Sequence, residues 1–82
     1  MVEASPVEVK SAKFWINEGF ARPRKTMNKR ITSYGLKHLA ERQAGSYISN
    51  EALIQAMIEC GFRAERIRNT PNYYFNVKLV EV

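Results

Sequence analysis

The sequence predicts a single α+β domain in which three helices are followed by a C-terminal β-hairpin. Three segments before residue 62 begin near capping residues and end close to a glycine, as helices do. Residues 73–82 are instead rich in aromatic and β-branched side chains that alternate with polar ones. With 82 residues, the chain fits one domain with a small core. We divide it into an N-terminal element (1–20), a basic linker (21–31) and a helix-turn-helix with a hairpin (32–82).

The first helix is predicted to begin at Ser5 and Pro6, with Glu8 completing a capping box. Gly19 would end it. A short strand over residues 7–9 is the alternative interpretation of its first turn. Residues 21–31 then show neither a helical nor a strand period, so we predict an extended linker.

The second helix is predicted over residues 34–43, with Thr32 and Ser33 as candidate caps and Gly45 as its stop. The third helix starts at Ser49 and ends before Gly61. Its apolar residues cover most of its circumference, which favours a central helix packed on several sides.

The C-terminal hairpin is predicted from two strand candidates, residues 63–68 and 73–82, joined by the turn cluster at 69–72. Helix, basic linker, helix, helix and hairpin is the element order of a winged helix. The third helix, the usual reader of base edges, offers Glu51 and Glu59 and no basic residue. We therefore expect it to be the core of the domain, not a recognition helix.

Positive charge is concentrated in one part of the chain. The balance is −1 over residues 1–20, +6 over 21–42 and zero over 43–82. The run RPRKTMNKR at 22–30 holds five cations and no acid, and it is interpreted as a solvated linker, a phosphate-binding segment or a dock for an acidic protein. The predicted nucleic-acid-binding residues are Arg22, Arg24, Lys25, Lys29, Arg30, Lys37, Arg63, Arg66 and Arg68.

Four aromatic residues are candidates for partner binding: Phe14, Trp15, Tyr73 and Tyr74. The alternative for Phe14 and Trp15 is a clamp that holds the N-terminal element to the core. Tyr73 and Tyr74, together with Phe75, would stack on bases, but alternation along a strand would place at least one of the three inside. An exposed pair of Phe14 and Trp15 would favour a homodimer.

No constellation in the sequence predicts catalysis, a metal site or a cofactor. His38 is the only histidine and Cys60 the only cysteine, and the chain contains no aspartate. One histidine and one cysteine do not make a zinc site, and neither residue has a predicted nucleophile or base beside it. With one cysteine and no apolar run of membrane-spanning length, a cytoplasmic protein without membrane contact is expected.

The strings SYGLKHLAE, YISNEALIQAMIECGF and NYYFNV resemble short orphan proteins of proteobacterial phages and other mobile elements, over about residues 24–80. The resemblance implies one of two roles: handling nucleic acid, or disabling host defence as anti-CRISPR proteins do. Together with the basic run, it predicts a non-enzymatic protein that contacts nucleic-acid phosphates, with DNA favoured over RNA. The alternative is a phage-type inhibitor or adaptor that binds a host protein such as a CRISPR effector.

Overall fold

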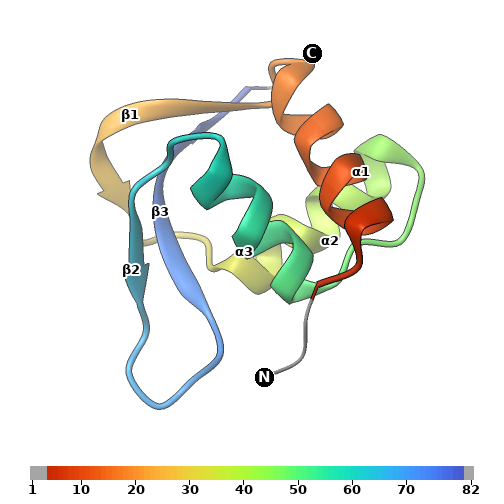
Figure 1. Ribbon diagram of the computed structural model, residues 1–82. Helices are drawn as coiled ribbons and strands as arrows, with labels where there is room; N and C mark the ends of the chain where they lie inside the picture. Colours follow the sequence, from red (N-terminus) through yellow and green to blue (C-terminus); the bar gives the residue numbers. More distant parts are fainter. Residues whose placement is uncertain (1–3, 81–82) are drawn as a thin grey trace.

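In the computed structural model, which describes residues 4–80, three helices pack against one face of a three-stranded antiparallel sheet (Figure 1). This confirms the α+β class with three helices and a C-terminal hairpin. The elements are α1 (Pro6–Asn17), β1 (Ala21–Asn28), α2 (Ser33–Ala44), α3 (Asn50–Glu59), β2 (Ala64–Arg66) and β3 (Tyr73–Leu79). The narrower winged-helix assignment stays a prediction.

The prediction of a linker is wrong for residues 21–28, which form β1, a strand of the sheet in addition to the two of the hairpin. The strand order is β1-β3-β2, so β3 is central and β1 is an edge strand. β1 shows no period of two because Ala21 is its only fully buried residue, and the next five are exposed. The apolar pattern that identifies a strand is therefore missing from an edge strand that contributes one small side chain to the core.

Two of the three predicted helix caps form as expected. The Thr32 hydroxyl accepts the Gly35 N–H, and the Ser49 hydroxyl accepts the Ala52 N–H. Ser5 makes no side-chain cap, and Glu8 does not complete a capping box. The Glu8 carboxylate instead accepts the backbone N–H of Ser49 at 2.8 Å, which ties α1 to the start of α3.

The core lies between the three helices and the inner face of the sheet. Trp15 of α1 and Phe75 of β3 are its largest fully buried side chains, and Leu36, Leu53 and Met57 are also completely buried. Because successive strand residues face opposite ways, the burial of Phe75 and Val77 turns Asn76 and Lys78 to the outer face.

Within residues 4–80, no helix is both long and apolar enough to cross a bilayer. In the same range, no three His, Cys, Asp or Glu side chains are grouped so that they could hold a metal ion.

Candidate nucleic-acid interface

Charge is divided between the two layers of the fold. The segments that build the sheet, residues 21–30 and 63–80, contain nine basic residues and one acid, a balance of +8. The segments that build the helical layer, residues 4–20 and 31–62, contain four basic and five acidic residues, a balance of −1. The positive potential of the protein therefore belongs to the sheet, and a polyanion would be attracted to that side.

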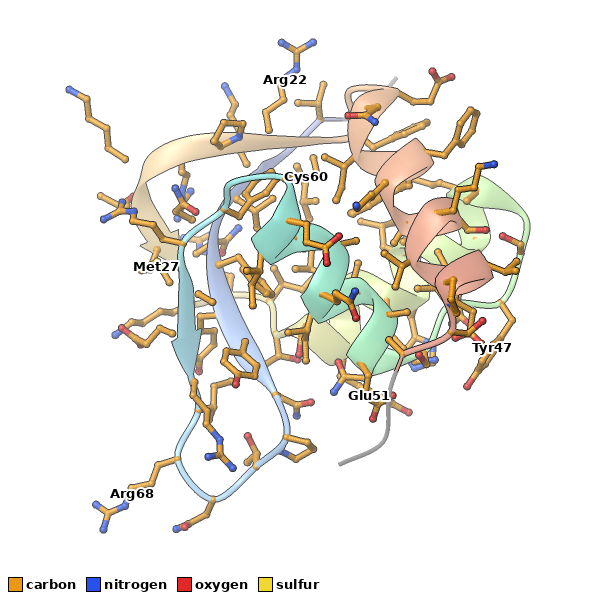
Figure 2. All side chains as sticks on the ribbon, viewed as in Figure 1. Arg22, Met27, Tyr47, Glu51, Cys60 and Arg68 are labelled. Carbon is orange, nitrogen blue, oxygen red and sulfur yellow. The ribbon has the colours of Figure 1, made fainter. Side chains whose placement is uncertain are left out.

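Arg22 and Lys78 form the clearest cationic pair on the sheet. They are direct partners in the antiparallel register of β1 and β3, and both are exposed. Neither has an acidic partner among residues 4–80. Like charges at directly paired positions destabilise a sheet, so this arrangement lowers stability unless an anion binds between them. Figure 2 shows Arg22 pointing into solvent at one end of the sheet and Arg68 at the other.

β1 carries a large bulge at the centre of the basic run. Four residues of β1, Arg24 to Met27, lie between the Pro23–Val77 and Asn28–Phe75 pairs, where β3 has only Asn76. The Arg24 guanidinium folds back to donate to the carbonyl oxygens of Thr26 (2.9 Å) and Met27 (3.1 Å). These bonds hold the bulge in one shape.

Two further side chains attach the bulge to the rest of the sheet. Arg63 donates from its guanidinium to the carbonyl oxygen of Lys25. Asn76 Nδ2 donates to the Arg24 carbonyl oxygen at 2.9 Å, while its Oδ1 accepts the Arg63 N–H at 2.7 Å. Asn76 thus connects the two edges of the sheet across the central strand, although it is an amide that is only 7% exposed.

We expect Asn76→Ala to lower the free energy of unfolding by about 2 kcal/mol, because it leaves the Arg24 carbonyl and the Arg63 N–H without partners. Urea denaturation followed by the fluorescence of Trp15 measures this change. Asn76→Asp is the matched variant, since a carboxylate still accepts the Arg63 N–H but cannot donate to Arg24. The free energy of unfolding of Asn76→Asp should lie between those of the wild type and Asn76→Ala. Equal stability of all three proteins would contradict the bridging role of Asn76.

Five of the predicted phosphate-binding residues are exposed, and their charged groups form neither an ion pair nor a hydrogen bond among residues 4–80: Arg22, Lys25, Arg30, Arg66 and Arg68. Lys29 instead lies 3.5 Å from the Glu65 carboxylate in an exposed pair. Arg24 and Arg63 are exposed, but their guanidinium groups already bind backbone carbonyls.

Lys37 does not belong to this surface, so its inclusion among the phosphate-binding residues is wrong. It is only 9% exposed, and its ammonium lies 3.1 Å from Glu41 Oε1 on α2. The same ammonium lies over the rings of Tyr34 and Tyr47, at 5.7 and 5.1 Å from their centroids. Its charge is therefore neutralised inside the helical layer.

The predicted aromatic residues separate into buried and exposed groups. Trp15 is fully buried and donates from its indole to Gln43 Oε1 at 2.7 Å, so the prediction that it binds a partner is wrong. Phe14, its neighbour on α1, is 58% exposed. Tyr73 packs against the core beside Phe75, whereas Tyr74 is half-buried on the outer face. The two tyrosines therefore do not form one stacking surface.

The exposed face of α3 carries Glu51, Gln55 and Glu59, and no cation lies on this helix. Glu59 pairs with Lys13 of α1 at 2.6 Å. Figure 2 shows Glu51 at the start of α3, on the helical side of the molecule and away from Arg22 and Arg68. Phosphate groups would be repelled here, which agrees with the expectation that α3 does not read bases.

Sequence reasoning missed the exposed Lys78 and the buried Asn76, which connects the two edge strands. The alternation over residues 75–79 places both on the outer face. Their importance depends on the pairing of β3 with β1, and this pairing is invisible when β1 is taken for a linker.

No protein-family model, curated protein or solved structure matches this chain. The geometry and charge of the sheet are therefore the grounds on which a function is inferred.

Proposed function

We propose that this protein is a non-enzymatic nucleic-acid-binding protein, acting in the cytoplasm, that contacts backbone phosphates through the outer side of its sheet. The observation that supports this most is the division of charge, +8 on the segments of the sheet and −1 on the helical layer. A surface for phosphate is rich in Lys and Arg and needs no particular base-reading side chain.

Duplex DNA is the favoured ligand. The seven residues of β3 extend over roughly 20 Å, a length that spans about six base pairs of B-DNA. With Tyr73 turned to the core, the outer face has no consecutive aromatic rings on which single-stranded bases would stack. Binding with little dependence on base sequence follows, because α3 offers no basic side chain.

The salt dependence of binding tests this proposal. Five exposed cations of the sheet segments have charged groups that form neither an ion pair nor a hydrogen bond among residues 4–80: Arg22, Lys25, Arg30, Arg68 and Lys78. Arg66 is not counted with them, because its register partner Tyr73 faces the core. If all five contact phosphate, the logarithm of the binding constant should fall with the logarithm of salt concentration at a slope of about −4.5. Fluorescence anisotropy with a labelled duplex measures the slope. Absence of binding at about 50 mM salt would refute the proposal.

A protein partner is the second candidate function, as for a phage-type inhibitor of a host protein. It is favoured by Tyr34 (46% exposed) and Tyr47 (66% exposed), which flank Lys37 away from the basic sheet. Exposed tyrosines are typical of protein interfaces. Pull-down of the tagged protein with and without nuclease distinguishes the two: a host protein retained after nuclease treatment supports the second candidate.

A further inference from the structure

The outward side of α1 bears three residues spaced four apart: Lys10, Phe14 and Glu18, which follows the last helical residue. This spacing places them along one side of the helix. Phe14 is 58% exposed, and both charged residues are exposed. Neither Lys10 nor Glu18 has an ion-pair partner among residues 4–80. An exposed ring thus lies between a cation on one side and an anion on the other.

We propose that this side of α1 joins two copies of the chain in an antiparallel, two-fold symmetric dimer. In a two-fold contact the same surface meets itself in reverse order. With Phe14 at the axis, Lys10 of each copy faces the partner's Glu18, and the two Phe14 rings meet between the two ion pairs. The order cation, ring, anion is complementary to itself only in this antiparallel arrangement, and a parallel arrangement would place like charges together.

The surface beside Phe14 is recessed and apolar. A groove of about 270 Å³ runs between α1 and the end of α2, and its walls include Val7, Ser11, Phe14 and Ala44. Val7 is 75% exposed although it is aliphatic. The short side chains of Ser11 and Ala44 leave room for a side chain from a second copy. Burying Val7 and Phe14 against that copy removes apolar surface from water, which favours association.

The basic strands β2 and β3 of each copy lie away from this contact. α1 lies on the side of the helical layer that faces away from β2 and β3 (Figure 1). Arg22, at the start of β1, is the cation of the sheet that lies near the contact, because its guanidinium approaches Gly19 just after α1. Because one side of a single helix makes the contact, we expect it to bury less than a standard interface of about 800 Å² per partner and the dimer to be weak.

Sedimentation equilibrium between roughly 1 μM and 1 mM, a range that brackets weak association, tests the dimer. Phe14→Ser should make the protein monomeric throughout. Lys10→Glu and Glu18→Lys should each weaken dimerisation at least about ten-fold, because one substitution places like charges together at both symmetry-related pairs. The combined Lys10→Glu/Glu18→Lys variant recreates both pairs with reversed polarity, so it should dimerise within about three-fold of wild type.

Tyr34→Ser is the matched control, because it removes an exposed ring from the far end of α2 and should leave dimerisation unchanged. Urea denaturation of every variant shows whether it is folded. A wild-type protein that stays monomeric to about 1 mM, or a double variant that remains as weak as the single ones, would overturn the dimer. The outcome is independent of nucleic-acid binding, since the cations of the sheet are untouched.

Discussion

Replacing Arg22 and Lys78 together by glutamine should weaken binding to duplex DNA about 200-fold at 50 mM salt. Each phosphate contact that releases a counterion contributes roughly a 15-fold factor to the binding constant at this salt concentration, and two contacts are lost. The two cations are direct cross-strand partners and form no ion pair among residues 4–80, so each is free to contact a phosphate. The salt slope should fall by about 2 in the same variant.

A substitution within the same pair should raise the stability of the fold although it weakens DNA binding. Arg22→Glu places a carboxylate directly across from Lys78 and turns a repulsive pair into an attractive one. We expect the free energy of unfolding to rise by about 0.5–1 kcal/mol while DNA binding falls. A residue whose replacement stabilises the fold and weakens binding is retained for binding, as is common at functional sites. Urea denaturation and anisotropy on one protein preparation measure both quantities.

Arg42→Gln is the matched control for the loss of one positive charge. Arg42 is exposed, but it lies in the last turn of α2, within the helical layer. If binding depends on the sheet surface, Arg42→Gln should change affinity much less than Arg22→Gln. Equal losses for the two variants would mean that net charge alone attracts the DNA, and that the pairing of β1 with β3 forms no site.

Local chemistry made most of the fold predictable. Thr32 and Ser49 cap their helices, and the aromatic and β-branched residues of 73–79 form the central strand. The strand β1 was not predictable in this way. Its cations and Pro23 give it no apolar period, and it exists because β3 offers an unpaired edge about fifty residues later in the chain. Such pairing is a tertiary property that overrides local preference.

The candidate site was predictable in its composition but not in its arrangement. Counting charge along the chain makes residues 43–82 neutral, and two of the four acids that balance the four cations, Glu51 and Glu59, belong to α3. The fold places these two acids in the helical layer and adds the hairpin cations to those of β1. The hydrogen bonds from the Arg24 and Arg63 guanidinium groups to backbone carbonyl oxygens depend on the bulge in β1. No local sequence pattern predicts this bulge. The burial of Lys37 similarly depends on Tyr47, ten residues away.

Glu41→Gln should lower the free energy of unfolding by about 3 kcal/mol, a large part of the roughly 4–12 kcal/mol expected for a domain of this length. Lys37 is nearly buried, and its ammonium has Glu41 as its carboxylate partner at 3.1 Å. Glutamine keeps the length of the side chain and can still accept the Ile48 N–H that Glu41 Oε2 accepts at 3.1 Å. The variant therefore removes the counter-charge of the buried ammonium, and with it the contact of Glu41 Oε1 with His38 Nδ1 at 3.3 Å.

Two further variants separate this cost from general disruption. Lys37→Met combined with Glu41→Gln removes the unpaired charge and should recover much of the lost stability. Glu59→Gln removes an acid from the exposed pair with Lys13 and should leave the urea midpoint nearly unchanged, because exposed pairs contribute little. A double variant no more stable than Glu41→Gln alone would show that the loss comes from packing around Tyr34 and Tyr47.

The pH dependence of the Glu41→Gln effect follows from the surroundings of the carboxylate. Burial alone would raise the pKa of Glu41, but the hydrogen bonds from the Ile48 N–H and Lys37, with the charge of Lys37, outweigh burial and lower this pKa. A lowered pKa in the folded state stabilises the protein fully above the unfolded-state value of about 4.3, and the contribution is lost as pH falls through the folded-state pKa. The stability difference between wild type and Glu41→Gln should therefore shrink as pH falls from 5 towards 2. A difference that stays constant over this range would mean that the negative charge of Glu41 does not stabilise the fold.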